Sequence, residues 1–276
     1  MYTGNTLKAP LTLHKMATQN KPLRIAILQN DTKSEGYGND FMNSFLTYIH
    51  GVKPDIEISI FDPIEKQEYP DLDNDKYDAI ILSGGTTEHD SSIPWVDKMQ
   101  RFVRDTVTAR PDQTLIGICW GHQAIHKALG GVVRTIPTGP FVQVGHELTP
   151  VGKEFFPNTT NEGILAINTM HHTEVLEPAP GFQVLLARNE ACLSANKNIL
   201  TIQAHPEIGP VFAEELVRQH FEKDLADGVM DEWLRKLNGI LDNGLVWQRI
   251  VQWIETQRIV ADGHGSGASI FRVLHK

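Results

Sequence analysis

The stretch LIGICWGHQAIHKALGG (residues 115–131) joins a short apolar strand to a helix through a cysteine flanked by glycines. Its centre, Gly117-Ile118-Cys119-Trp120-Gly121, has the form of a nucleophile elbow with cysteine in the place of serine. A residue at so sharp a turn is in a strained backbone conformation, and side chains two positions away on either side would collide, so the two glycines leave room. The turn also places the sulfur at the positive end of the following helix, which favours the reactive thiolate. We therefore expect Cys119 to be a nucleophile.

Outside this stretch, short β-branched runs alternate with helical patterns over the first half of the chain. The runs that predict strands are LRIAIL (23–28), IEISIFD (56–62), YDAIILS (77–83) and LIGIC (115–119). Alternation of this kind is typical of βαβ units around a parallel sheet, and near-continuous apolar strands indicate helices on both faces. A crossover helix is predicted at 94–109, where apolar residues recur at helical spacing.

The second half of the chain changes character. Residues 131–200 carry strand and turn signals and predict a small mixed or antiparallel addition to the sheet. Three amphipathic patterns follow and predict C-terminal helices at 210–226, 230–241 and 243–260. The expected fold class is therefore α/β, with an open, mostly parallel sheet flanked by helices.

Composition limits the classes of function. The 276 residues are 41% hydrophobic and 21% charged, as in an ordinary soluble globular protein, and we expect one domain over 23–260, a flexible leader at 1–22 and a loosely ordered tail at 261–276. The formal charge of -9, without a cluster of Lys and Arg, argues against nucleic acid as a partner. No apolar run reaches the ~20 residues of a membrane span. With only two cysteines a disulfide framework is excluded, which fits a reducing, cytoplasmic setting.

The base that a thiolate nucleophile requires is predicted at His205. This histidine follows the apolar strand pattern ILTIQA (199–204) and precedes Pro206 and Glu207. Because proline ends the regular strand, His205 and Glu207 can be held on one side of the chain at the carboxyl end of a strand, where ligands of open α/β sheets bind. The second cysteine, Cys192, lacks a glycine pair and a following helix, and we interpret it as a buried core thiol.

Together, the segments G-I-C-W-G-H-Q (117–123) and Q-A-H-P-E (203–207) resemble the signatures of the class I glutamine amidotransferase family, which are Gly-x-Cys-x-Gly-x-Gln and His-Pro-Glu. Three further segments resemble the family: YDAIILSGGT (77–86), LGGVVR (129–134) and MHHTEV (170–175). The resemblance spans roughly residues 23–221, and two motifs in the right order make it more specific than either alone. It implies the flavodoxin-like fold of that family.

The resemblance also implies roles for residues of the elbow and of the His-Pro-Glu motif. Cys119 would form a γ-glutamyl thioester, His205 would act first as a base and then as an acid, and Glu207 would orient the imidazole. Backbone N–H groups of Gly85 and Trp120 would hold the oxyanion. Neither a cofactor nor a metal ion is expected.

For substrate binding, the resemblance implies Gln123, Gly84 and His171. The chain departs from the family at two places in these segments. Ser83 precedes the glycine pair where the family often has a proline, and Thr173 stands where the family's histidine loop usually has an aspartate.

Alternative folds with a similar elbow are less consistent with the sequence. An α/β-hydrolase would need a late histidine, for which His264 in a Gly-rich segment is the candidate. A related fold in which a histidine directly follows the cysteine is disfavoured, since Trp120 stands at that position.

Three functions remain open within the amidotransferase-like family. Only 69 residues follow Glu207, too few for a synthase module of ordinary size. The leading hypothesis is a free-standing hydrolase of γ-glutamyl amides such as glutamine or γ-glutamyl peptides and conjugates. The second is a glutaminase subunit that supplies ammonia to a separate synthase partner. The third is a catalytically silent binding or regulatory module.

Overall fold

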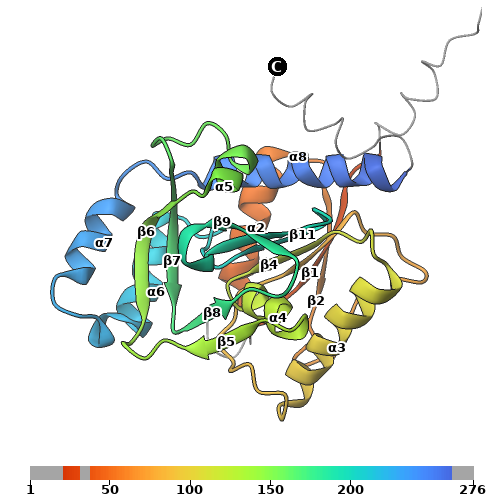
Figure 1. The fold of residues 1–276 in the computed structure, drawn as a ribbon, viewed down its shortest axis with the longest axis horizontal. Coiled ribbons are helices and arrows are strands. Elements are labelled where there is room, and N and C mark those ends of the chain that lie inside the picture. The colour runs from red at the N-terminus through yellow and green to blue at the C-terminus, as the bar shows by residue number, and fades with distance from the viewer. Residues whose placement is uncertain (1–20, 32–37, 263–276) are drawn as a thin grey trace, which may run out of the picture.

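The computed structural model of the protein describes residues 21–31 and 38–262 (Figure 1). The segments expected to form the leader (1–22) and the tail (261–276), including His264, lie almost wholly outside the described residues.

The centre of the fold is a seven-stranded sheet in the order β2-β1-β3-β4-β11-β10-β9. Its first five strands are parallel, and the last two are antiparallel additions at one edge. The strands are β1 (Arg24–Leu28), β2 (Glu57–Phe61), β3 (Ala79–Leu82), β4 (Leu115–Ile118), β9 (Phe182–Leu186), β10 (Ala191–Ser194) and β11 (Ile199–Ile202). The expected open, mostly parallel sheet with a small antiparallel addition is confirmed.

Helices cover both faces of this sheet, as Figure 1 shows. They are α2 (Gly38–Val52), α3 (Pro94–Ala109), α4 (Trp120–Ala128), α5 (Pro150–Phe155), α6 (Pro210–His220), α7 (Val229–Leu237) and α8 (Asn243–Ala261), with short 3-10 turns η2 (Ala187–Asn189) and η3 (Glu222–Asp224). The crossover helix has the predicted bounds of 94–109. The three C-terminal helices occur where the periodicity predicts them, but α6 and α7 end at His220 and Leu237, before the predicted 226 and 241. Among the described helices, none is both long and apolar enough to cross a membrane.

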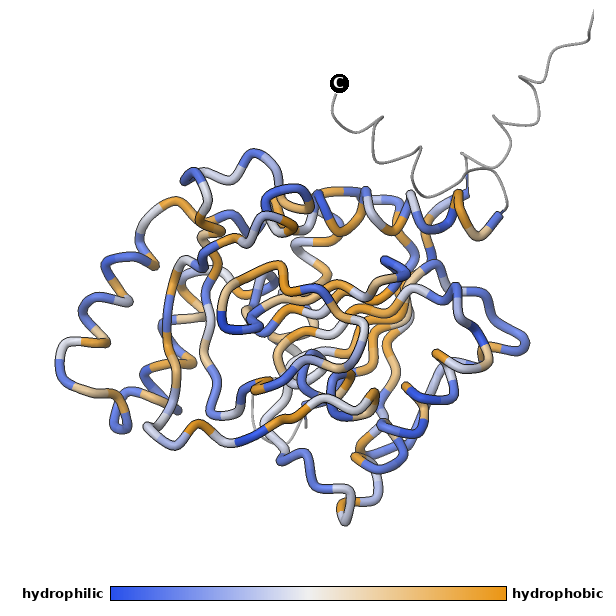
Figure 2. The backbone as a smooth tube through the Cα atoms, in the orientation of Figure 1, coloured by the Kyte–Doolittle hydropathy of each residue, from blue (hydrophilic) through white to orange (hydrophobic). Residues whose placement is uncertain are grey.

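Alternating strand residues pack into two separate hydrophobic layers, and the central strands are the most hydrophobic part of the tube in Figure 2. Ile25 and Ile27 of β1 face the layer that contains α2 and α8. Ala26 and Leu28 face the layer that contains α3 and α4. Each face is therefore covered by helices, which explains why these strands read as continuous apolar runs.

Two small antiparallel sheets stand beside the main one. They pair β5 (Val132–Thr135) with β8 (Thr173–Glu177), and β6 (Phe141–Glu147) with β7 (Ile164–His171). Helix α7 is anchored to β7 by a hydrogen bond from Trp233 Nε1 to Asn168 Oδ1 of 2.9 Å. These additions place β7 and α6 at the carboxyl edge of the parallel strands, around the end of β4 (Figure 1).

Candidate active site

Cys119 lies at the sharp turn between β4 and α4. Its backbone angles are φ 48° and ψ −102°, a left-handed φ that side-chain-bearing residues rarely adopt. The Cys119 N–H donates to the carbonyl of Ile202 at 2.8 Å, and the Gln123 N–H donates to the Cys119 carbonyl at 3.1 Å. Strain of this kind persists only where the surroundings hold it in place. These two bonds tie the turn to β11 and to its own helix.

The two flanking glycines are required by close backbone contacts. A Cβ atom on Gly117 would lie 2.5 Å from the Gly121 carbonyl oxygen. A Cβ atom on Gly121 would lie 2.2 Å from the Leu82 carbonyl oxygen of β3. The expectation that these positions leave room for the turn is confirmed, and the turn packs directly against the neighbouring strand.

The structure brings His205 and Glu207 to the same edge of the sheet. Because β11 pairs in parallel with β4, with Ile202 opposite Ile118, the segments that follow the two strands emerge side by side. His205 Nδ1 lies 2.8 Å from Glu207 Oε1, and both side chains are buried. The imidazole also interacts with Cys119, 86 positions earlier in the chain, and both side chains line the same cavity. Since Nδ1 is engaged by the carboxylate, Nε2 is the nitrogen that faces the sulfur.

The charges around His205 favour its protonated form. Burial by itself lowers the pKa of this imidazole, but the charges of Cys119 and Glu207, together with hydrogen bonds to both, outweigh that effect. The result is a pKa raised from 6.5 to about 10. An imidazolium at this place stabilises a neighbouring thiolate, so the arrangement suits a cysteine that attacks a carbonyl carbon.

Two backbone segments lie where oxyanion donors are expected. Gly85 packs so closely on the end of β1 that a Cβ atom would lie 2.1 Å from the Asn30 carbonyl oxygen, and it lines the cavity at Cys119. Trp120 opens α4, and the first N–H groups of a helix have no acceptor within it. The Trp120 side chain is itself buried and donates from Nε1 to the Thr87 carbonyl at 2.7 Å. The Trp120 side chain is therefore already engaged, and only the backbone N–H of Trp120 is available as a donor to a substrate.

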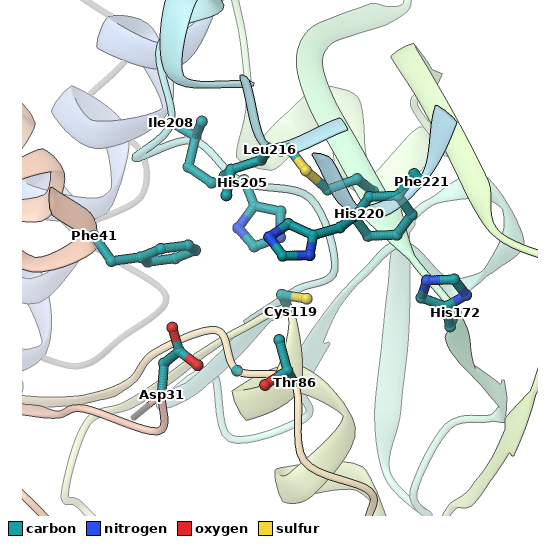
Figure 3. A pocket seen from close by; sticks show the side chains of 12 residues that line it. Asp31, Phe41, Thr86, Cys119, His172, His205, Ile208, Leu216, His220 and Phe221 are labelled. Atoms are coloured by element: carbon teal, nitrogen blue, oxygen red, sulfur yellow. The ribbon is translucent and has the colours of Figure 1, made fainter. Parts of the chain in front are cut away.

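A cavity of about 280 Å³ opens at the sulfur of Cys119 (Figure 3). Gly85, Cys119 and His205 are among the residues that line it. The remaining lining residues come from the loops after β1 and β3, from α2, from β7 and its following turn, and from the segment around α6: Asp31, Phe41, Thr86, Met170, His172, Ile208, Leu216, His220 and Phe221. The walls are mainly apolar, with a few polar groups, as is usual for sites that bind small molecules.

Gln123 does not line this cavity, although the family resemblance implies that it binds substrate. Its amide is held inside the protein: His89 Nε2 lies 2.7 Å from Oε1, while Nε2 donates to the Thr173 carbonyl at 2.6 Å and to Gln203 Oε1 at 3.0 Å. These bonds join α4 to β8 and to the end of β11. The geometry therefore indicates that Gln123 holds the elbow in position without contacting the cavity.

Gly84 and His171 also differ from what a direct substrate contact would require. A Cβ atom on Gly84 would lie 3.1 Å from His205 Cε1, so this glycine makes room for the imidazole. His171 is buried, with Nε2 3.3 Å from Glu190 Oε1. It is His172 that lines the cavity, where its ring stacks on Phe221 at 4.7 Å between centroids.

Several lining residues were not among those predicted from the sequence. Phe41, Ile208, Leu216 and Phe221 are apolar residues in or beside helices, and helical periodicity marks such positions only as inward-facing. Their presence in the cavity wall depends on where α2 and α6 lie over the sheet.

Cys192 is fully buried in β10, as its sequence context predicts. Burial, and next the charge of Glu190, raise the pKa of its thiol to about 12, which keeps the thiol protonated and unreactive. The described part of the chain holds no group of three or more His, Cys, Asp or Glu side chains that could bind a metal ion.

The family model for class-I glutamine amidotransferases matches residues 38–223. The chain therefore belongs to the class I glutamine amidotransferase family.

The relatives that the chain resembles have names that refer to different activities. The chain is 32% identical over 238 residues to the glutamine amidotransferase-like protein chyE of Penicillium rubens, covering 84% of this chain and 97% of the relative. It is 25% identical over 229 residues to gamma-glutamyl peptidase 3 of Arabidopsis thaliana, covering 78% and 86%. It is 29% identical over 180 residues to the glutamine-hydrolysing GMP synthase subunit of Saccharolobus solfataricus, covering 62% and 86%.

Solved structures support the same fold. A glutamine amidotransferase from Thermotoga maritima superposes with a TM-score of 0.62 at 17% identity, over 84% of this chain and 98% of the other. At this identity the likeness concerns the fold alone.

Proposed function

We propose that the protein hydrolyses γ-glutamyl amide bonds through a thioester on Cys119. The observation that carries this proposal is the series Cys119–His205–Glu207 at a cavity, in which Cys119 interacts with an imidazole that is hydrogen-bonded to Glu207 and the cysteine lies in a strained elbow. The similarity to a gamma-glutamyl peptidase over 78% of the chain supports the substrate class.

In the first half of the reaction, the Cys119 thiolate attacks the γ-carbonyl carbon and a C–S bond forms. The carbonyl oxygen becomes an oxyanion, which the N–H groups of Gly85 and Trp120 stabilise. When the tetrahedral intermediate collapses, the C–N bond breaks and the leaving nitrogen takes the proton from His205 Nε2. The products of this half are a free amine and a glutamyl thioester.

In the second half, His205 accepts a proton from water as the water oxygen attacks the thioester. Collapse of this second intermediate breaks the C–S bond, releases glutamate and restores the thiolate beside the imidazolium. Glu207 keeps Nδ1 hydrogen-bonded throughout, so that Nε2 remains the nitrogen that exchanges protons.

A second candidate is a glutaminase subunit that passes ammonia to a separate synthase. The observation that favours it is the similarity to the glutamine-hydrolysing subunit of a GMP synthase. The same thioester chemistry would serve both functions, and they differ in the amine released and in the need for a partner protein.

The test measures glutamate release by the purified protein from glutamine and from a γ-glutamyl dipeptide. We expect Cys119→Ala to remove all release while leaving the circular dichroism spectrum unchanged, and Cys192→Ala, which removes the buried thiol, to remain active. Trapping of a glutamyl adduct on Cys119, detected by mass spectrometry, would support the thioester.

The outcomes separate the candidate functions. Release from the dipeptide without any partner supports the hydrolase, whereas release from glutamine alone that is weak until a synthase is added favours the ammonia-supplying role. Full activity in Cys119→Ala would refute the thioester on Cys119. No adduct and no release from either compound would refute the hydrolase and leave a binding module.

A further inference from the structure

We infer, on the basis of the proposed hydrolysis, that the preferred substrate carries an apolar group on the amide nitrogen that leaves. The group would bind against Phe41, Ile208 and Leu216, which we name the amine-side wall. All three line the cavity at Cys119.

The position of the leaving nitrogen follows from the chemistry. His205 must deliver a proton to that nitrogen, so the nitrogen lies within hydrogen-bond reach of the imidazole and its substituent extends along whatever flanks the ring. Two of the three wall residues flank His205 directly. The Phe41 ring meets the imidazole edge-on at 5.9 Å between centroids, and the Ile208 N–H donates to the His205 carbonyl at 3.2 Å.

Figure 3 shows how the wall lies relative to the sulfur. Ile208 and Leu216 lie on the His205 side of Cys119, and Asp31 and Thr86 lie on the opposite side. A glutamyl group carries an α-ammonium and an α-carboxylate, which need polar partners. The polar side chains across the sulfur therefore suit the glutamyl end, and the amine-side wall suits the leaving amine.

The wall discriminates between leaving groups by their polarity. Ammonia, released from glutamine, has no substituent to contact the wall, whereas an alkyl or aryl group would displace water from it. The described residues that line the cavity include no Lys or Arg, so a carboxylate on the amine would have only imidazoles such as those of His172 and His220 as cationic partners, and it would lose its hydration against the apolar wall. The preferred class is therefore a γ-glutamyl amide of an apolar amine.

The wall is the part of the hydrophobic core that borders the cavity, since all three side chains are buried members of the core layer that contains α2 and α8. Phe41 packs edge-on against Phe212 of α6 at 5.8 Å, which fixes its ring between the two helices. Protein interiors are close-packed, yet here the three apolar side chains border open space next to the nucleophile. A substituent of matching shape would fill that space.

The test uses a series of γ-glutamyl amides whose amines differ in size but hardly in basicity: the ethylamide and the 3-methylbutylamide, with γ-glutamylglycine as the charged member. We expect kcat/KM for the 3-methylbutylamide to exceed that for the ethylamide by at least about tenfold, since each added methylene in an apolar pocket has an effect of that order. The glycine compound should be the poorest of the three.

Variants of α6 test whether the wall causes this preference. Leu216→Ala should reduce the ratio of kcat/KM between the 3-methylbutylamide and the ethylamide by about fivefold or more. Val211→Ala, on the same helix but 83% exposed and outside the cavity lining, is the matched control and should leave the ratio unchanged. A flat series in the unaltered protein, or an equal loss for both amides in Leu216→Ala, would overturn the inference.

Binding separates this inference from the proposed function. If none of the amides is hydrolysed, the proposed function fails, and the wall is then tested by calorimetry with Cys119→Ala. Tighter binding of the 3-methylbutylamide than of the ethylamide supports the wall, and equal affinities overturn it.

Discussion

Acidification should destabilise the protein through His126, a buried histidine of α4 that is fixed in its neutral form. The ring is inaccessible to solvent, and its two nitrogens have different partners. Nδ1 accepts from the Ala179 N–H at 3.0 Å, and Nε2 lies 3.0 Å from Thr201 Oγ1. A proton on Nδ1 would replace an acceptor by a second donor and break the bond to Ala179. Burial lowers the pKa of His126 from 6.5 to about 4.

The size of the effect follows from the two pKa values. Since the folded pKa lies below the unfolded one, the folded state binds fewer protons, and the stabilisation is fully present above pH 6.5 and is lost as the pH falls toward 4. Between pH 7 and pH 5, the free energy of unfolding should fall by about 2 kcal/mol on account of this residue alone.

Urea unfolding of the wild type and of His126→Gln at the two pH values provides the assay, because glutamine does not titrate and can still accept the Ala179 bond. The wild type should lose about 2 kcal/mol more than the variant on acidification. Comparing the two proteins cancels other groups, including His205, whose raised pKa acts in the opposite direction. Equal pH dependence in both proteins would refute the reasoning.

Three other predictions concern the elbow, a buried carboxylate and the catalytic pH range. Gly121→Ala should destabilise the protein by about 1–3 kcal/mol in urea unfolding, because its Cβ would meet a carbonyl of β3 at 2.2 Å. The control Gly244→Ala, with open space around the added Cβ, should be neutral or stabilising. Equal effects of the two substitutions would contradict this. Asp242→Ala should lower the free energy of unfolding by about 3 kcal/mol, since its carboxylate accepts from the Thr160 hydroxyl and from the backbone amides of Thr160 and Ala166. A change in the free energy of unfolding below experimental error would contradict this. On the alkaline side, the hydrolysis rate should fall as the pH rises past about 10, where His205 loses its proton, and an alkaline fall centred near 6.5 would contradict the raised pKa.

The elbow could be predicted from the sequence because its requirements are local. A strand, a cysteine and two glycines lie within seven positions, and the close contacts of Gly117 and Gly121 are made mostly by the turn itself and the adjacent strand. His205 and Glu207 were predictable for the same reason, since both follow a strand that a parallel sheet sets beside the first.

Residues that depend on tertiary placement were less predictable. His171 and His172 are neighbours at the end of β7, where successive side chains point to opposite faces, so the sequence alone does not say which one reaches the cavity. Gln123 stands one turn after Cys119, but its partners His89 and Gln203 come from distant segments. The groups that hydrogen-bond with the Gln123 amide therefore depend on the assembled fold.

In the proposed function, chemistry and substrate preference come from different parts of this fold. The ends of β3, β4 and β11 hold the glycine loop, Cys119 and His205, and these parallel strands are hydrogen-bonded to one another. The amine-side wall comes from α2, α6 and the turn before α6, which pack over that edge without belonging to the sheet. A substitution at Leu216 therefore reshapes the cavity while the backbone contacts that strain Cys119 stay intact. The elbow tolerates few substitutions because backbone atoms lie too close to both of its glycines for a side chain to fit. The wall consists of side chains, and their size can vary. Differences in the amine released by members of this fold should accordingly reside in the flanking helices.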